Sequence, residues 1–280
     1  MLDSLDALLE TAGLTGRGSL LPLSGGDIAA VYRLTTDQGD VVVKSDVPAR
    51  LAGEAEGLQA LARANSGLIV PEVLGQQGAW LVMEALEAAP AHQRRAAALG
   101  EGLRKLHGNT GEEHGWPRDN ACGSTPQPNK PLLDGRAFQR ERRLLPLAQA
   151  CYAKGLLDKR LKAAIETIAE SLEAWLEDVP ASLVHGDLWS GNVLYTLRGP
   201  AIIDPAVYRH YPEVDLAMLT LFGSPGSAFF EAYWDGAAPA DWERRETLFQ
   251  LYPLLNHLLL FGGGYHQAVV RAINKLQTVS

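Results

Sequence analysis

The stretch from Ser182 to Pro205 constrains the fold more than any other part of the sequence. It reads SLVHGDLWSGNVLYTLRGPAIIDP, in which three short apolar runs are separated by polar residues. Apolar runs of this length, bounded by Gly, Pro, Asn and Asp, are typical of short strands joined by turns. The pattern predicts a hairpin over residues 193–203, with the tripeptide His-Gly-Asp at 185–187 before it and Asp204 directly after it.

Three polar side chains of this stretch suit phosphoryl transfer to a hydroxyl group. In that reaction one carboxylate orients the hydroxyl, while an amide oxygen and a second carboxylate hold Mg²⁺ on the nucleotide phosphates. Asp187, Asn192 and Asp204 are residues of these types in the required order. Asp and Asn are also common in turns that have no catalytic role. The five-residue step from Asp187 to Asn192, followed by an Asp at the end of a strand, favours the catalytic interpretation.

The composition limits the class of protein. A chain of 280 residues can bury a core as one large domain or as two lobes. Its formal net charge of −8, with no stretch dense in Lys and Arg, argues against a nucleic-acid partner. The acidic N-terminus does not resemble a signal peptide, and no apolar run reaches the roughly 18 residues of a membrane span. Cys122 and Cys151 are too few for a disulfide framework. We therefore expect a cytoplasmic protein that does not bind a membrane.

A change of hydrophobic period near residue 13 predicts a small sheet. Residues 3–12 carry apolar side chains at helical spacing, whereas residues 20–23, 28–34 and 41–44 form strand-like runs separated by turn residues. Gly25 and Gly26 lie between the first two runs, where glycine lets backbone N–H groups approach phosphate oxygens. The chain has no Walker A sequence. The two glycines alone are therefore weak evidence for a phosphate-binding loop, and the interpretation needs support from the residues that follow.

That support comes from Lys44, which ends a run of valines, and from the helix expected over residues 49–65. At 100° per residue Glu54 falls at the edge of the apolar face of this helix, while Glu56 falls on the opposite side, which we expect to face solvent. A carboxylate directed inward needs a partner. We therefore expect an ion pair between Lys44 and Glu54 that positions nucleotide phosphates. The alternative is that Lys44 reaches into solvent from the end of its strand.

Farther along, residues 71–86 predict another hairpin, and the acidic, Ala/Pro-rich segment to Pro90 suggests a connection between two lobes. Beyond residue 90 the pattern is helical, apart from the polar stretch 109–133. A loop of that length is commonly a lid or binding loop, or is disordered. Helices are expected over residues 91–107, 135–153, 156–178 and 213–222, and within 226–279.

These residues together resemble the fructosamine kinase (ketosamine-3-kinase) family, a branch of the aminoglycoside-phosphotransferase and choline-kinase-like group. The likeness covers almost the full length. Its most specific part is HGDLWSGN at 185–192, where Gly186 replaces the Arg of the kinase H-R-D motif. Further matching segments are TPQPN (125–129), RERRL (140–144), DPAVY (204–208), EVDLAM (213–218), LYPLLNH (251–257) and FGGGY (261–265).

The resemblance implies an α+β, two-lobed, protein-kinase-like fold. The small N-lobe, residues 1–86, would bind the nucleotide, and the larger helical C-lobe, residues 87–280, would hold the catalytic loop and the acceptor. The implied reaction is ATP- and Mg²⁺-dependent phosphorylation of the 3-hydroxyl of a ketoamine, either a small molecule or a glycated protein side chain. A phosphate at O3 is a leaving group β to the C2 carbonyl, so the product would tend to release the amine.

The family also implies roles for individual residues. Asp187 resembles the catalytic base, for which an ordinary carboxyl pKa of about 4 would be adequate. Trp189 is expected either to contact the sugar or to anchor the loop. Other implied roles are Mg²⁺ ligation by Asn192 and Asp204, phosphate positioning by Gly25, Gly26, Lys44 and Glu54, adenine contact by Glu84 and Leu86, and support of the loop by His185 and Asp215.

Two other functions are compatible with parts of this pattern. A kinase for a different hydroxyl, such as that of an aminoglycoside, choline or a free sugar, would use the same phosphate chemistry with another acceptor pocket. A nucleotide-binding pseudokinase is a third hypothesis. The sequence argues against a pseudokinase, because no catalytic or metal position is substituted.

Overall fold

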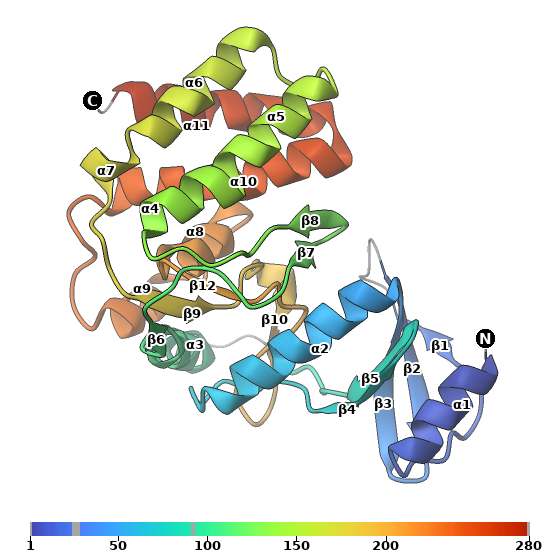
Figure 1. Ribbon diagram of the computed structural model, residues 1–280. Helices are drawn as coiled ribbons and strands as arrows, with labels where there is room; N and C mark the ends of the chain where they lie inside the picture. Colours follow the sequence, from blue (N-terminus) through green and yellow to red (C-terminus); the bar gives the residue numbers. More distant parts are fainter. Residues whose placement is uncertain (1, 24–28, 91–92, 279–280) are drawn as a thin grey trace.

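The computed structural model describes residues 2–23, 29–90 and 93–278 and contains an antiparallel sheet near the N-terminus and a larger helical region (Figure 1). The five strands of the sheet lie in the order β1-β2-β3-β5-β4, and every neighbouring pair is antiparallel. The α+β fold class expected from the sequence is therefore confirmed. The strands are β1 (Leu21–Pro22), β2 (Ala30–Thr36), β3 (Gly39–Ser45), β4 (Val73–Gln77) and β5 (Trp80–Glu84).

Each face of the sheet is covered by a helix. α1 (Leu2–Thr11) packs on the face that holds Val41 and Val43, and α2 (Pro48–Arg63) packs on the face that holds Leu81 and Met83. Side chains alternate between the two faces along a strand. Lys44, one residue after Val43, therefore lies on the face covered by α2, the helix that carries Glu54.

Helices dominate the rest of the described chain. The largest hydrophobic cluster among the described residues has members within 147–151, 165–169, 248–258 and 269–276, in the helices at the top of Figure 1. No helix in the described part of the chain is both long and apolar enough to cross a membrane. The helices are α3 (Gln93–His107), α4 (Gly135–Phe138), a π-helical turn (Gln139–Leu144), α5 (Leu145–Ala153), α6 (Lys159–Glu170), α7 (Leu172–Trp175), α8 (Glu213–Leu221), α9 (Ser227–Trp234), α10 (Trp242–Phe261) and α11 (His266–Thr278).

Short strands lie between the sheet and the helices. The hairpin predicted over residues 193–203 is present, with Val193 opposite Ile202 and Tyr195 opposite Pro200. Its second strand ends two residues before Asp204, so the hairpin brings Asp204 back toward Asn192. The short strands are β6 (Thr110–Gly111), β7 (Asn120–Cys122), β8 (Thr125–Gln127), β9 (Ala181–Val184), β10 (Val193–Tyr195), β11 (Pro200–Ile202) and β12 (Tyr208–His210).

The polar stretch 109–133 is ordered and packed, so disorder is the wrong alternative. It contains β6 and the β7–β8 hairpin, and Gln127 and Asn129 are fully buried. Arg143, itself fully buried, holds this stretch by donating to Pro128 O and Asn129 Oδ1, both at 2.7 Å. The Arg143 guanidinium also lies over the ring of Tyr208, 4.1 Å from its centroid. These contacts fix a hairpin whose tip reaches the site described next.

Candidate active site

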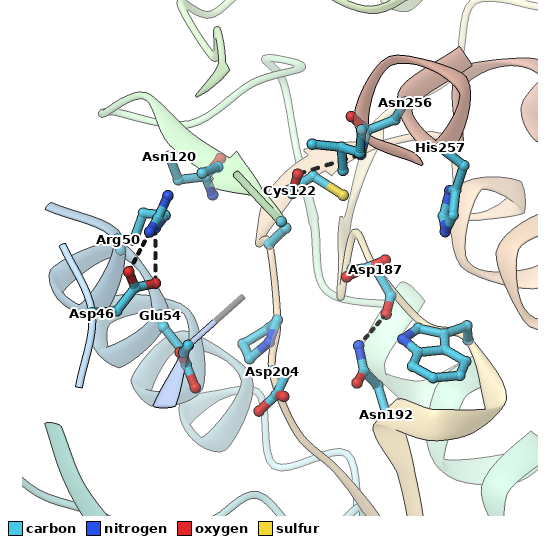
Figure 2. Close-up of a pocket in the computed structure, with 18 of the residues that line it drawn as sticks. Asp46, Arg50, Glu54, Asn120, Cys122, Asp187, Asn192, Asp204, Asn256 and His257 are labelled. Atoms are coloured by element: carbon cyan, nitrogen blue, oxygen red, sulfur yellow. Dashed lines mark hydrogen bonds and ion pairs between the residues drawn. The ribbon is translucent and has the colours of Figure 1, made fainter. Parts of the chain in front are cut away.

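A pocket of about 550 Å³ is lined by residues of both the sheet region and the helical region. Figure 2 shows α2 on one side of it, the β7–β8 hairpin above and the residues of α10 opposite. Asp187 lies between these elements. The predicted residues that line the pocket are Lys44, Glu54, Asp187, Trp189, Asn192 and Asp204.

The loop that carries Asp187 is shaped by Gly186. Its φ of +84° favours glycine, and a Cβ there would lie 2.1 Å from the carbonyl oxygen of Ala206. Glycine at this position lets the catalytic loop lie directly against the segment that follows Asp204. This close approach explains why Arg, the kinase residue at this place, is absent.

Asp215 of α8 holds the same loop from behind. Its carboxylate accepts the N–H groups of His185 at 2.7 Å and of Gly186 at 2.8 Å. It also accepts from His107 Nε2 at 3.1 Å, and its side chain is fully buried. Three donors to one buried carboxylate fix its position, so Asp215 anchors the loop backbone as the sequence suggested.

His185 uses both ring nitrogens within the fold. Nε2–H donates to Ile203 O at 2.9 Å, and Nδ1 accepts the N–H of Asp187 at 3.3 Å. Burial lowers the pKa of His185, so the neutral ring is favoured. These contacts suit a brace between the loop that carries Asp187 and the segment that carries Asp204, and they leave no ring nitrogen for proton transfer.

The environment of Asp187 differs from the expectation of an ordinary pKa. Burial, followed by the negative charges of Asp204 and Asp215, raises the pKa of this carboxyl group to about 7. The Cys122 thiol lies beside the Asp187 carboxylate and partly opposes the rise. Burial in turn raises the pKa of Cys122 well above its ordinary value, so it is present as a thiol. The sequence did not reveal this contact, because Cys122 lies 65 positions before Asp187.

Asn192 and Asp204 provide oxygen ligands of the kind that Mg²⁺ prefers. Asn192 Nδ2 donates to the main-chain oxygen of Asp187 at 2.8 Å, which turns the amide oxygen away from that carbonyl. Asp204 has a φ of +55°, a conformation uncommon for residues other than glycine, and its side chain is 41% exposed. Such backbone strain is often found at functional sites. The donor set therefore fits a magnesium ion held together with phosphate oxygens.

Lys44 lies at the centre of the charged part of the pocket. Its Nζ is 2.6 Å from Glu54 Oε1 and also pairs with the carboxylate of Asp204. Burial alone would lower the pKa of Lys44, but the two carboxylates outweigh it and the pKa is raised. The predicted ion pair with Glu54 is thus present, and the alternative of Lys44 in solvent is wrong.

The expectation that Glu56 faces solvent is also wrong. Glu56 accepts hydrogen bonds from Trp116 Nε1 at 3.1 Å and from Arg118 Nη2 at 2.7 Å. The helical period placed Glu56 correctly on the side of α2 away from Glu54. It could not show that this side is covered by residues more than 50 positions downstream.

The two residues expected to contact adenine, Glu84 and Leu86, do not line this pocket. Glu84 Oε1 is 2.6 Å from Arg198 Nη2, and the N–H of Glu84 donates to Glu72 O at 2.9 Å. Leu86 is half-buried. Neither residue lines the pocket, so their contact with adenine stays a prediction. Gly25 and Gly26 lie outside the described residues.

Trp189 is partly anchored and partly exposed to the pocket. Its indole lies over Gly191, where a Cβ would be 2.2 Å from the ring, so the Trp-Ser-Gly sequence makes room for its own tryptophan. The ring meets Phe222 edge-on at 6.5 Å between centroids and remains 37% exposed. The geometry accommodates both roles considered for Trp189.

A group of aromatic residues continues from Trp189 along the pocket wall, and the sequence interpretation gave it no role. His257 is its centre, 5.0 Å from Phe222, 5.0 Å from Tyr265 and 5.5 Å from Phe261 between ring centroids. His257 and Phe261 are four residues apart on α10 and therefore share a face. That spacing was the available signal, but it is equally typical of a core helix. Below, these four residues and Trp189 are called the aromatic wall.

Comparison with known proteins agrees with this geometry. The sequence matches the profile of the family described as fructosamine kinase over residues 11–278. The chain belongs to the fructosamine kinase family. It is 36% identical to a protein of Thermus thermophilus named probable ketoamine kinase, across 96% of this chain and 98% of the relative. It is 33% identical to the chloroplastic protein-ribulosamine 3-kinase of Arabidopsis thaliana, across 90% of this chain and 80% of the relative.

Solved structures extend the comparison of this fructosamine kinase family member. A candidate fructosamine-3-kinase of Thermobifida fusca superposes with a TM-score of 0.90 at 31% identity, covering 99% of this chain and 98% of the other. The streptomycin–ATP complex of an aminoglycoside phosphotransferase superposes with a TM-score of 0.63 at 18% identity, covering 99% and 95%. The second likeness shows the fold alone.

Proposed function

We propose that this protein transfers the γ-phosphoryl group of ATP to the 3-hydroxyl of a ketoamine. The observation that carries the proposal is the position of Asp187 between two unlike ends of one pocket. Lys44, Glu54 and Asp204 form a charged end, and the aromatic wall forms the other. A group that bridges a phosphate donor and an organic acceptor has to lie in such a place.

The charged end, called the phosphate end below, would bind the triphosphate, and the aromatic wall is called the acceptor end. Asn192 and Asp204 would hold Mg²⁺, which neutralises phosphate charge and orients the phosphates for in-line transfer. Lys44 would contact phosphate oxygens as an ammonium group that Glu54 holds in place. Because these charges are in position before the reaction, little reorganisation is needed as charge shifts to the leaving group.

Asp187 would orient the acceptor hydroxyl and accept its proton. The O3–P bond forms while the bond between the γ-phosphorus and the bridging oxygen of ADP breaks, and the O3 proton moves to the Asp187 carboxylate. A base with a pKa of about 7 is well matched to this task near neutral pH. The anchors Asp215 and His185 would keep the carboxylate aimed at the hydroxyl.

The aromatic wall would bind the acceptor. Flat aromatic faces suit the apolar faces of a sugar, and they attract a cationic amine such as the secondary ammonium of a ketoamine. The printed names of the relatives specify ketoamine and protein-ribulosamine. We extend these names to this chain, with either a small ketoamine or a glycated protein side chain as the acceptor.

Two further proposals follow from the sequence. Residues 1–86 would act as the nucleotide-binding lobe and residues 87–280 as the catalytic and acceptor lobe. A reducing compartment such as the cytoplasm would suit Cys122 and Cys151, which are both buried free thiols.

The proposal is tested by measuring ADP release with a panel of acceptors: ribulosyl-lysine, fructosyl-lysine, an aminoglycoside and choline. We expect turnover with at least one ketoamine, none with the other two compounds, and loss of turnover when EDTA removes Mg²⁺. A higher kcat/KM for the aminoglycoside or for choline would favour a kinase for another hydroxyl. Mg²⁺-dependent ATP binding without turnover on any acceptor would favour a pseudokinase.

A further inference from the structure

Helix α2 is packed on two sides, and the two sides contact different parts of the molecule. Leu51, Ala55 and Leu58 pack against Leu81 and Met83 of the sheet. Ala60, on the opposite side of the helix, and Leu61, near its C-terminal end, belong to a separate hydrophobic cluster of the helical region. Figure 1 shows α2 lying between the sheet and the helical region.

Two glycines allow the close approach of α2 to the helical region. A methyl group at Gly53 would lie 3.3 Å from Asn120 Cβ, and one at Gly57 would lie 3.1 Å from Val207 Cγ2. Gly57 also faces Pro205, at 3.2 Å. Glycine is unfavourable inside a helix, and neither residue has a positive φ that would require it. The four-residue spacing places both on one face, which rests against β7 and the segment that follows Asp204.

Beside these glycines, Glu56 is held by two side chains of the helical region. Trp116 donates to Oε1 at 3.1 Å, and Arg118 donates to Oε2 from Nε at 3.0 Å and from Nη2 at 2.7 Å. The Glu56 side chain is 24% exposed and that of Arg118 is 76% exposed. The bond from Trp116 is therefore better shielded from water than the ion pair.

The segment that carries Trp116 and Arg118 is itself fixed. Asn120 Nδ2 donates to Val207 O at 2.9 Å, and Gln127 Nε2 donates to Asn120 Oδ1 at 2.8 Å. Glu56 is thus attached to a rigid part of the helical region, next to the segment that bears Asp204.

We propose that Glu56, Trp116 and Arg118 form a clamp that positions α2 so that Glu54 holds Lys44 at the phosphate end of the pocket. Glu54 and Glu56 lie about 200° apart around the helix, so any rotation or shift of α2 that releases Glu56 also displaces Glu54. The clamp residues are positioning residues, because they act on the phosphates only through Glu54 and Lys44. The proposal rests on the proposed function in one respect, the role of Lys44 as a phosphate ligand.

The clamp also bears on the division of the chain into lobes. Residues 1–86 would be one lobe by sequence, but α2 is tied to the helical region by the clamp and by the two glycine contacts. α2 therefore joins the two regions, because it is packed on the sheet through Leu51 and Leu58 and tied to the helical region through Glu56.

A double-mutant cycle tests the clamp. Affinity for the Mg²⁺ complex of a non-hydrolysable ATP analogue is measured by calorimetry for the wild type, Glu56→Ala, Glu54→Ala and the double variant, with no acceptor present. Loss of a buried hydrogen bond and an ion pair at Glu56 should weaken binding about three- to tenfold when Glu54 is present. Without Glu54 the same change should weaken binding less than about twofold, because Glu56 then has no side chain at position 54 through which to position Lys44.

Two variants and one control complete the experiment. Glu56→Gln keeps an acceptor for Trp116 and should recover most of the affinity, whereas Gly57→Ala should weaken binding by pushing α2 from Val207. Gln59→Ala, on the exposed side of α2, should change neither affinity nor Tm. Independent, additive effects of Glu54→Ala and Glu56→Ala would overturn the clamp, as would unchanged affinity in both Glu56→Ala and Gly57→Ala.

Failure of the clamp is distinguishable from failure of the proposed function. The binding cycle needs no acceptor, so its result stands whether or not a ketoamine is phosphorylated. Additive effects of Glu54→Ala and Glu56→Ala in an enzyme that phosphorylates ketoamines would contradict the clamp hypothesis and leave the proposed function intact. Should Glu56→Ala fail to fold, Gly57→Ala replaces it in the cycle with Glu54→Ala, and additive effects of that pair would overturn the clamp.

Discussion

The two ends of the pocket are lined by side chains of different chemistry, charged at one end and aromatic at the other. At the phosphate end Lys44, Glu54 and Asp204 are charged and paired with each other, and they come from β3, α2 and the end of the β10–β11 hairpin. At the acceptor end the aromatic wall comes from the helical region alone, and Phe222 and Phe261 are 42% and 51% exposed. We propose from this difference that the phosphate end performs chemistry common to phosphotransferases and that the acceptor end selects the acceptor.

Asp187 lies where the two ends meet, so its replacement should have the largest effect. We expect Asp187→Asn to lower kcat by about 10²–10⁴-fold, the usual cost of losing a general base. The KM for ATP should change little, because the phosphate end is untouched. Steady-state kinetics with a saturating ketoamine measures both quantities, and near-wild-type turnover would contradict the assignment.

The next largest effect should come from the phosphate end alone. Lys44→Met removes the buried ammonium group and should raise the KM for ATP by about 10- to 100-fold, the range expected for a lost charged hydrogen bond. The KM for the ketoamine should stay within about twofold of wild type. If both KM values rise together, the two ends are not separable in the way proposed.

A smaller and opposite pattern is expected at the acceptor end. Trp189→Ala or Phe222→Ala should lower kcat/KM for the ketoamine by up to about tenfold, the magnitude of a lost aromatic contact. The KM for ATP should not change. Leu197→Ala is a matched apolar control, because Leu197 is 83% exposed and does not line the pocket. Equal losses of kcat/KM in Leu197→Ala and Phe222→Ala would contradict the proposal that the aromatic wall binds the acceptor.

The smallest expected effect is on stability, through two buried histidines that lie outside the pocket. Burial lowers the pKa of both His114 and His210, whose Nδ1 atoms are 2.9 Å apart. Because each histidine takes up a proton in the unfolded state below about pH 6.5 before it does so in the folded state, these two residues should lower stability as the pH falls below that value. Each histidine can cost up to about 1.4 kcal/mol per pH unit. Calorimetric Tm values of Asp187→Asn at pH 7.5 and 5.5 measure this without the opposing titration of Asp187, and a Tm that rises on acidification would contradict it.

The phosphate end could be predicted from the sequence because its signals are local. Asp187, Asn192 and Asp204 lie within one stretch, and helical spacing alone separated Glu54 from Glu56. The same reasoning failed for the surroundings of Glu56, because a helical period shows which side a residue occupies but not what covers that side. The raised pKa of Asp187 was missed for a similar reason, since burial and the Cys122 contact depend on the packed hairpin 120–127.

Of the aromatic wall, the sequence singled out only Trp189, and its contact with the acceptor stays a prediction. His257 and Phe261 lie on α10, about 70 residues downstream, in a helix whose other residues form the core, so their spacing carried no sign of a pocket. Gly186 shows how structure can explain a sequence feature that was noticed but not understood. Its unusual place in the His-Gly-Asp motif follows from contact with the Ala206 carbonyl, which no local pattern reveals.

The most direct test is to locate the phosphate in the product. Ribulosyl-lysine is incubated with ATP, Mg²⁺ and either the wild-type protein or Asp187→Asn, and the product is analysed by mass spectrometry and ³¹P NMR. The account predicts a single phosphate on O3 with the wild type and almost none with Asp187→Asn. Phosphate on another oxygen, or equal amounts from both proteins, would contradict it.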